Sequence, residues 1–440
     1  MYLKKSIRIL IGTGCCVLVL ISWVITVNIK PVAEKQLVLI DRATALINDG
    51  IYIRALPLLE EAAGLNSIHT RTAEEKLKGL YLLLNENNGF SRKYTSLLDK
   101  QINRNDAEPY MFIEAANYYL GISKQQDALI ILKTGMEKTG DTSIKELYES
   151  SRYQYEISRT VYENTTAIFE KTIQVQNEGK WGIAAADGTL IIPCDYDKIS
   201  TFSKDRAVVM NSDITYAVDK NNNRIAIIHE EIFDFTNLAE NRIAILFENG
   251  WRRATGEFAV GSSRFEAIGM YSQGYAAAKV NGKWGVIDIF DNWLIPAEYE
   301  EIVKDELGRC YAQNALFVRS GDFVYLFTNG AFFAEAYEDA RPFSDEGYAA
   351  VKKNGKWGFI DNNGTEVIAF IYDDALSFGQ HLAAVKLGEY WGYISLYGHL
   401  VIDTEFFDAK SFSGGSAPVL TDRGWQFITL LEYKKGTNLL

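Results

Sequence analysis

The residues that most often carry chemistry in proteins are few in this chain and are not arranged for it. It has four cysteines and four histidines, and no histidine stands at metal-ligand spacing from another histidine or from a cysteine. The histidines are His69, His229, His381 and His399. No P-loop, G-x-S-x-G, H-E-x-x-H or C-x-x-C motif is present. The sequence therefore predicts no metal, no cofactor and no catalytic residue.

Paired carboxylates are the remaining candidates for acid–base chemistry. Asp373 is adjacent to Asp374, and Glu300 to Glu301, but adjacent side chains of a strand point to opposite faces. Such pairs fit poorly to a glycosidase site, where two carboxyl groups face one substrate. The Asp-Asn-Asn-Gly run from Asp361 lacks the later glutamate of a calcium loop and is interpreted as a turn. We expect a protein without catalysis, and an enzyme stays open as the alternative.

One short motif recurs through the C-terminal part of the chain. Trp-Gly occurs four times, and degenerate copies in the same register are found at Thr215, Trp251, Phe323 and Trp425. The successive spacings are 34, 36, 33, 39, 34, 34 and 34 residues. Six tryptophans share this register: Trp181, Trp251, Trp284, Trp357, Trp391 and Trp425. A uniform register is typical of core residues, so we expect these rings to pack between units, with ligand stacking as the alternative.

A second marker, an aromatic residue followed by an acid, precedes each copy. The eight pairs run from Tyr162-Glu163 to Phe407-Asp408. We expect each acid to cap the next turn or to face solvent, while a ring of acids that attracts a cation or a basic partner is the alternative. The glycine after each tryptophan is expected to let a neighbouring backbone approach closely.

These elements resemble the bacterial WG-repeat family, which is named for the Trp-Gly dipeptide. The matching elements are Gly-Lys-Trp-Gly, Asp-x-x-Gly, Ile-Pro and Tyr-Asp, and the resemblance covers about residues 162–433. It implies the repeat unit but no particular activity, because the family as a whole has no single assigned chemistry.

Each unit divides into short runs separated by turn residues, and such short strands must stack on neighbouring units to bury both faces. Eight units over residues 160–440 predict an all-β repeat array, with a β-propeller favoured and an open β-solenoid as the alternative. The last unit lacks a clear fourth run after Trp425. Residues 153–157 stand where that run would be needed, so we expect them to complete the last blade and close the ring.

Residues 32–158 show the apolar periodicity of helices. The segment around Phe112, Ala116 and Ala128 is similar to the tetratricopeptide pattern, whose period is 34 residues. The expected inner faces are Phe112, Ala115, Ala116 and Tyr119, then Ala128, Leu132 and Gly135, with a second helix pair at Leu39, Ala43 and Leu46 and at Ala55, Leu59 and Ala62. An α-solenoid with a groove for a partner peptide is the functional interpretation, and a small helical bundle is the alternative.

The N-terminal segment predicts a membrane anchor. Residues 9–29 carry no formal charge and are long enough to span a bilayer as one helix. Lys4, Lys5 and Arg8 in the tail of residues 1–8 predict a cytoplasmic N-terminus. The sequence thus predicts a single-pass protein of the cell membrane whose bulk is extracytoplasmic. A cleaved signal peptide and a lipoprotein signal are the alternatives.

Charge and repeat architecture together favour a binding protein. The net charge of −12 argues against duplex nucleic acid as a partner. We expect a membrane-anchored scaffold that recognises a protein or an envelope glycan through its repeat surfaces. A carbohydrate-binding module or carbohydrate-active enzyme that uses loops on one rim is the alternative. The fifth unit departs most from the repeat, so we expect a recognition loop there, formed by Lys304, Asp305, Glu306 and Arg309.

Overall fold

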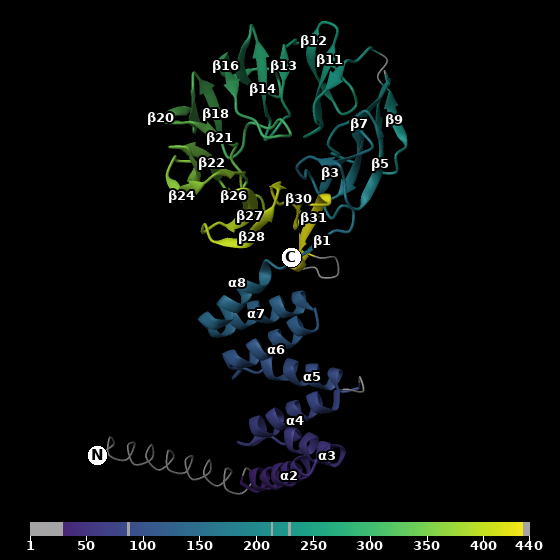
Figure 1. Ribbon diagram of the computed structural model, residues 1–440, viewed down its shortest axis with the longest axis vertical. Coiled ribbons are helices and arrows are strands. Elements are labelled where there is room, and N and C mark those ends of the chain that lie inside the picture. Colours follow the sequence, from purple (N-terminus) through teal and green to yellow (C-terminus); the bar gives the residue numbers. More distant parts are fainter. Residues whose placement is uncertain (1–29, 86–88, 213, 228–229, 434–440) are drawn as a thin grey trace, which may run out of the picture. The chain divides into compact units, whose positions relative to one another are not determined.

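The chain folds into two compact units. The computed structural model describes residues 30–85, 89–212, 214–227 and 230–433. The boundary between the units lies between Tyr148 and Glu149. Figure 1 shows that the first unit is built of helices and the second of small β-sheets arranged in a ring. Each unit has its own hydrophobic core.

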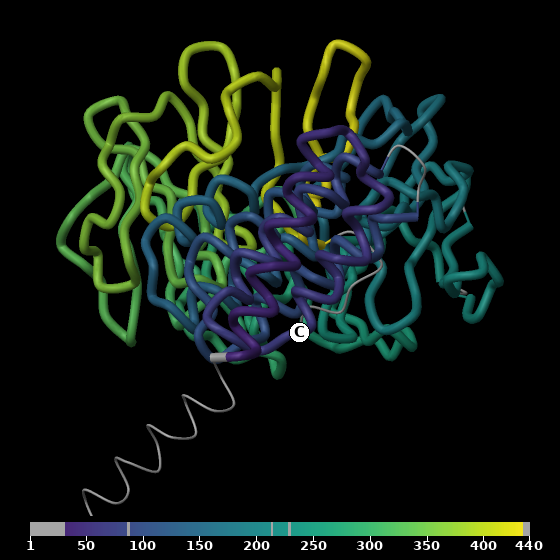
Figure 2. Tube along the Cα trace, turned by 90° about the horizontal axis from the view of Figure 1, so that it is seen from below, coloured from purple at the N-terminus to yellow at the C-terminus, as the bar shows by residue number. Residues whose placement is uncertain are grey.

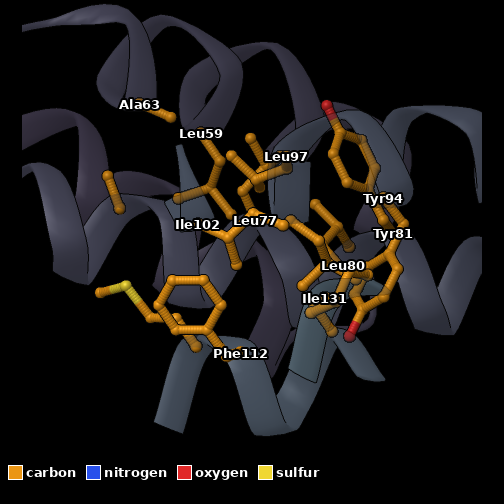
Figure 3. Close-up of a cluster of buried hydrophobic side chains, with 14 of the residues drawn as sticks. Leu59, Ala63, Leu77, Leu80, Tyr81, Tyr94, Leu97, Ile102, Phe112 and Ile131 are labelled. Carbon is orange, nitrogen blue, oxygen red and sulfur yellow. The ribbon is translucent and has the colours of Figure 1, made fainter. Parts of the chain in front are cut away.

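Successive helices of the N-terminal part pack on one another. The described residues hold seven helices: α2 (Lys30–Asn48), α3 (Tyr52–Gly64), α4 (Thr70–Leu84), α5 (Ser91–Ile102), α6 (Pro109–Gly121), α7 (Gln125–Thr139) and α8 (Thr142–Arg152). Close packing joins α2 to α3, α3 to α4 and α6 to α7. Figure 3 shows part of the shared core, in which Leu80 lies beside the rings of Tyr81 and Tyr94 and Leu77 lies in the middle of the cluster.

The predicted inner faces of these helices are confirmed. Phe112, Ala115 and Ala116 on α6 are fully buried, as are Ala128 and Leu132 on α7. Small residues allow the close approach, because a Cβ atom on Gly135 would lie 2.8 Å from Cγ of Phe112. The faces Leu39–Ala43 and Ala55–Leu59–Ala62 are buried in the same core. That these helices are tetratricopeptide repeats stays a prediction.

The second unit is an eight-bladed β-propeller. Seven of its eight sheets have four strands, and the strands are antiparallel; they follow the chain in every sheet except the eighth, which takes β1 as its fourth strand (Figure 1). The first blade consists of β2 (Asn164–Thr165), β3 (Thr172–Asn177), β4 (Lys180–Ala185) and β5 (Leu190–Tyr196), and the second of β6 (Lys198–Ile199), β7 (Ala207–Asn211), β8 (Ile214–Val218) and β9 (Arg224–Ile227). The third consists of β10 (Asp234–Phe235), β11 (Arg242–Phe247) and β12 (Gly250–Thr255). The fourth consists of β13 (Ala267–Ile268), β14 (Tyr275–Val280), β15 (Lys283–Asp288) and β16 (Trp293–Tyr299).

Blades five to eight repeat the same plan. The fifth blade consists of β17 (Glu301–Ile302), β18 (Ala315–Ser320), β19 (Phe323–Thr328) and β20 (Ala331–Tyr337), and the sixth of β21 (Asp339–Ala340), β22 (Tyr348–Lys353), β23 (Lys356–Asp361) and β24 (Glu366–Tyr372). The seventh consists of β25 (Asp374–Ala375), β26 (Leu382–Leu387), β27 (Tyr390–Ser395) and β28 (Leu400–Phe406). The eighth consists of β29 (Asp408–Ala409), β30 (Ser416–Thr421), β31 (Gly424–Leu430) and β1 (Tyr155–Ile157). A 3₁₀ turn, η3 (Leu431–Tyr433), follows β31. In the three-stranded third blade, isolated bridges to Val260 and Phe265 stand in place of the fourth strand.

The ring closes where the ends of the array meet. Strand β1 pairs antiparallel with β31, with Tyr155 opposite Leu430 and Ile157 opposite Ile428. The amide of Leu431 also donates to the carbonyl of Gln154, at 2.8 Å. The predicted closure by residues 153–157 is confirmed, and the array is a propeller rather than an open solenoid. In the turned view of Figure 2, the trace runs through the hairpins of successive blades from teal to yellow.

The predicted transmembrane helix is the part of the expected fold class that must be corrected. Residues 9–29 lie outside the described residues. Among the helices that are described, none is long and apolar enough to cross a bilayer, which conflicts with a single-pass membrane protein. The fold is therefore a row of helices followed by a β-propeller, and the predicted location in the cell membrane is not supported.

Removing the closing strand should weaken the ring. We expect residues 162–440 to be less stable than residues 149–440 by about 2–4 kcal/mol, because several backbone hydrogen bonds of the last blade are lost. Thermal unfolding of the two purified chains, followed by circular dichroism at the β-sheet band, measures the difference. Equal melting temperatures would show that β1 does not stabilise the closed ring.

Candidate functional site

The two repeat markers meet as cross-strand neighbours. In the sixth blade Trp357 on β23 lies opposite Tyr372, the last residue of β24. The same pairing recurs as Trp181 with Tyr196, Trp251 with Phe265, Trp284 with Tyr299, Trp391 with Phe406 and Trp425 with Tyr162. The last of these pairs joins the eighth blade to the first, so the motif that builds each blade also helps to close the ring.

The glycine of each of the four Trp-Gly pairs makes room for the backbone of the fourth strand. A Cβ atom on Gly358 would lie 2.8 Å from the carbonyl oxygen of Ile368, and one on Gly392 would lie 2.6 Å from that of Ile402. The register of the two strands shifts at this point, as in a β-bulge. The expected close approach is confirmed, and the approaching backbone belongs to the same blade.

The tryptophans of the register are buried to different degrees. Trp357, Trp391 and Trp425 are buried, with 3%, 6% and 7% of their surface exposed. Trp181, Trp251 and Trp284 are only partly buried. In the fifth blade the structure moves the register by one residue: Val324, not Phe323, lies opposite Tyr337 and is buried, whereas Phe323 is exposed.

The acids of the second marker cap the turn between the second and third strands. The amide of Gly388 donates to Asp373 at 2.7 Å, and that of Gly355 donates to Glu338 at 3.0 Å. Glu163, Asp197, Glu266 and Glu300 accept a turn amide in the same way. Lys356 and the Gly388 amide lower the pKa of Asp373. Turn capping was one of the two expected roles, and it uses these acids within their own blades.

The capping position is not acidic in two blades. Phe233 and Phe407 occupy it in the third and eighth blades, and each exposes 51% of its surface. The acids that follow them, Asp234 and Asp408, are the first residues of the innermost strands β10 and β29. The marker is therefore displaced by one residue in these two copies, which places both acids in the innermost strands.

The insertion of the fifth blade crosses the centre of the ring. The Asn237 amide group of the third blade donates to the carbonyl of Leu307 at 3.1 Å, and the amide of Met270 in the fourth blade donates to that of Gly308 at 3.0 Å. The Leu307 side chain is buried among residues that include Ala239 and Met270. A segment that contacts blades on several sides of the ring must lie in its channel. We call residues 304–309 the plug.

The charged groups of the plug are held by protein partners. Glu306 forms an ion pair with Lys410 of the eighth blade, at 2.5 Å. Arg309 pairs with Asp305 at 2.6 Å. Lys304 donates to the carbonyl of Ile302, and its nitrogen lies 4.0 Å from the ring centre of Trp284. Burial lowers the pKa of Lys304 and raises that of Glu306. The predicted loop thus lies at the centre of the ring, and its part in recognition stays a prediction.

A cavity of about 780 Å³ remains beside the plug. Its walls come mainly from blades five to eight, including Arg341, Ser344, Asp374, Trp391 and Asp408. Near the first four blades the channel is filled by the contacts of Leu307 and Gly308. The cavity is therefore the open half of the central channel, and its lining carries both acidic and basic side chains.

The described residues offer little for catalysis at this site. No group of three or more His, Cys, Asp or Glu side chains in the described ranges could hold a metal ion. The thiol of Cys310 is fully buried, and burial raises its pKa to about 12, so it is a poor nucleophile. Mixed charges and aromatic walls of this kind are typical of ligand-binding sites.

The sequence did not identify this cavity. Its lining comes from the innermost strands and the turns after them, which carry no uniform motif. One signal was available: the residue after each innermost strand varies strongly, with Arg341, Leu376 and Lys410 in the last three blades.

Comparison with known proteins identifies the repeat. The profile of the family described as "WG containing repeat" matches residues 181–213, 262–284, 284–305, 328–357, 357–391 and 391–425. Among curated proteins, no sequence matches this chain.

Solved structures match the chain at low identity. A eukaryotic initiation factor has 11% identity over 62% of this chain and 87% of its own, with a TM-score of 0.42. The Neurospora crassa Pan2 WD40 domain has 11% identity over 62% and 89%, with a TM-score of 0.34. YCF48 bound to a D1 peptide has 11% identity over 65% and 97%, with a TM-score of 0.32. The propeller assignment rests on the strand order of this chain itself.

Burial of the repeat tryptophans predicts unequal effects of their removal. Trp357→Ala should lower the free energy of unfolding by about 3–5 kcal/mol, as other large-to-small core changes do. Trp181→Ala should lower it less, because that ring is already partly exposed. Trp293→Ala, outside the register and exposed, is the control. Denaturant unfolding gives the three values, and equal losses would contradict a core role for Trp357.

The packing of the plug can be tested separately. Leu307→Ala should lower the free energy of unfolding by about 2–4 kcal/mol, because it leaves a gap among the buried residues of the channel. Leu387→Ala, at a half-exposed leucine that ends β26, should have little effect. If both changes are neutral in denaturant unfolding, the plug does not support the ring.

Proposed function

Because the propeller of this chain is built from WG repeats, we propose that the protein is a non-catalytic binding scaffold that holds part of a partner polypeptide in its central channel. The observation that carries the proposal is the cavity of about 780 Å³ beside the plug. Its volume lies in the range of sites that enclose a ligand or a few side chains.

The use of polar groups elsewhere in the ring supports this choice of site. In six blades the acids of the repeat accept turn amides, and many remaining charges pair within or between neighbouring blades. A side chain that is already hydrogen-bonded or ion-paired within the propeller is less available to bind a partner. The cavity is different because Phe343, Phe378 and Phe412 lie in its wall beside charged groups. Aromatic walls with a few placed charges are typical of recognition sites.

A shallow groove on the helical unit is a second candidate surface for the same function. It has a volume of about 420 Å³ and lies along α3, α4 and α5. Its lining includes the basic residues Arg92, Lys93 and Lys100 and the ring of Tyr81. Lys93 is already paired with Glu60, and Lys100 with Glu74, so part of this charge serves the fold. We therefore place the main site in the propeller.

Filling the cavity should abolish partner binding. Peptides would be selected from a displayed random library on the purified full chain, and their affinities measured by fluorescence anisotropy. Ser413→Trp puts a large ring at the cavity wall, at a serine whose side chain has no hydrogen bond that it would lose. We expect it to weaken the selected peptides at least tenfold without loss of β-structure.

Ser320→Trp is the matched control, because Ser320 is exposed at the end of β18 and does not line the cavity. It should bind the peptides as the unchanged protein does. Peptides that bind both variants equally would move the site to the helical groove. A library that yields no binder, together with binding on a glycan array, would overturn the proposal in favour of carbohydrate recognition.

A further inference from the structure

The sixth blade contains a cation that serves one ring and two carboxylates. The guanidinium of Arg341, which follows β21, lies 4.4 Å from the ring centre of Trp357. It also donates to the carboxylate of Asp374, the first residue of the next blade, at 3.3 Å. The same guanidinium lies 3.6 Å from the carboxylate of Asp339 in its own blade. One cation thus covers the repeat tryptophan of its own blade and neutralises the innermost acid of its neighbour.

The seventh blade keeps the tryptophan and the acid of the next blade but lacks the cation. Leu376 follows β25 as Arg341 follows β21, and their amides donate to equivalent carbonyls, those of Ala384 and Ala350. The tryptophan of this blade is Trp391, and the innermost acid of the next blade is Asp408. A leucine can lie against a ring, but it cannot pair with a carboxylate.

Asp408 is consequently left without a counter-charge. Its carboxylate accepts only the amide of Ala409 among the hydrogen bonds of the described residues, and no described Lys, Arg or His forms an ion pair with it. Leu376, Trp391 and Asp408 all line the cavity. The wall therefore has an apolar strip that leads to an unpaired acid.

The plug adds a second acid to the same region. Glu306 also lines the cavity, and among the described residues its ion-pair partner is Lys410. Burial raises the pKa of Glu306, and the charges of Asp305 and Asp408 act in the same direction. Arg309 pairs with Asp305, and Arg341 with Asp374, so neither faces Asp408 as a free cation.

An unsatisfied hydroxyl in the same wall points independently to a ligand. The Oγ atom of Ser344 is buried and has no hydrogen-bond partner among the described residues, and its residue is 7% exposed. Buried polar groups in proteins are nearly always paired, so an unpaired hydroxyl calls for a specific explanation such as a bound water, ion or ligand. Ser344 lines the cavity together with Asp408.

We propose that the cavity binds a basic side chain of the partner, arginine best, whose aliphatic stem lies along Leu376 and Trp391 and whose charged head pairs with Asp408. This proposal rests on the proposed function and specifies its ligand. The bound guanidinium would supply the counter-charge that Arg341 supplies one blade earlier. Arginine suits the site better than lysine because its planar group stacks on rings and pairs with carboxylates through two bonds.

The test compares two peptide libraries on the full chain. Both have the form of four random residues on each side of a fixed centre, which is arginine in one and citrulline, its uncharged analogue, in the other. Binding is measured by fluorescence anisotropy. We expect the arginine library to bind at least about tenfold more tightly, as a cation–π contact and an ion pair together allow.

Two variants locate the site, and one controls for charge. Asp408→Asn removes the acid, and Leu376→Arg gives the seventh blade its own cation; each should reduce the preference for arginine to less than twofold. Asp403→Asn, at an exposed acid of β28 outside the cavity, should leave it unchanged. Circular dichroism and melting temperature confirm that each variant is folded. If Leu376→Arg does not fold, Asp408→Asn alone decides.

The outcomes separate this inference from the proposed function. Peptides that bind in the cavity with no preference for arginine over citrulline overturn the inference and leave the binding function standing. Binding of the free amine spermidine, lost in Asp408→Asn, with no peptide binding would support cation recognition and overturn a polypeptide partner. Binding of neither probe overturns both. An arginine preference that persists in Asp408→Asn places the site elsewhere and also contradicts the inference.

Discussion

The pairing of a third-strand tryptophan with an aromatic residue of the second repeat marker is the contact that recurs in six of the eight blades. In the four blades with a Trp-Gly pair, the glycine is required because the carbonyl of the fourth strand comes too close for any Cβ atom. The pairing also places the chain at the entrance to the next blade, since a single residue separates the aromatic of one blade from the innermost strand of the next. Local packing and the path around the ring are therefore set by one contact.

The last blade of the ring must take its fourth strand from outside the repeat array. The eighth blade takes β1 from the chain that precedes the first blade, and Trp425 pairs with Tyr162 of the first blade. Once this is done, the array leaves only the short edges of the outermost strands of its blades exposed. Closure also creates the central channel, and the plug of the fifth blade fills only part of it.

Residues that recur in the repeat stabilise the blades, whereas residues that vary between blades line the cavity. Where the repeat is kept, its polar residues cap turns or neutralise each other, and the blades are alike. The plug interrupts the repeat, and the residue after each innermost strand varies from blade to blade; both the plug and Leu376 line the same cavity. Specific recognition in a repeat fold needs such a break, because identical blades present the same groups in every direction.

The sequence determined the repeat unit, its number, the closing segment and the buried faces of the helices. These follow from spacing and periodicity, because each blade and each helix pair is built from neighbours in the chain. It misplaced single residues, such as Phe323 for Val324, since a one-residue shift in a degenerate copy leaves the spacing almost unchanged. It also placed the insertion as a recognition loop without indicating that it enters the channel.

Only the tertiary structure decided which blades face one another across the ring. Glu306 and Lys410 are 104 residues apart, and nothing in their local sequence pairs them. The cavity, the unpaired carboxylate of Asp408 and the plug all arise from that arrangement. A closed ring brings distant residues together through the sum of eight small rotations between blades, and such a sum is a property of the whole array that no single repeat encodes.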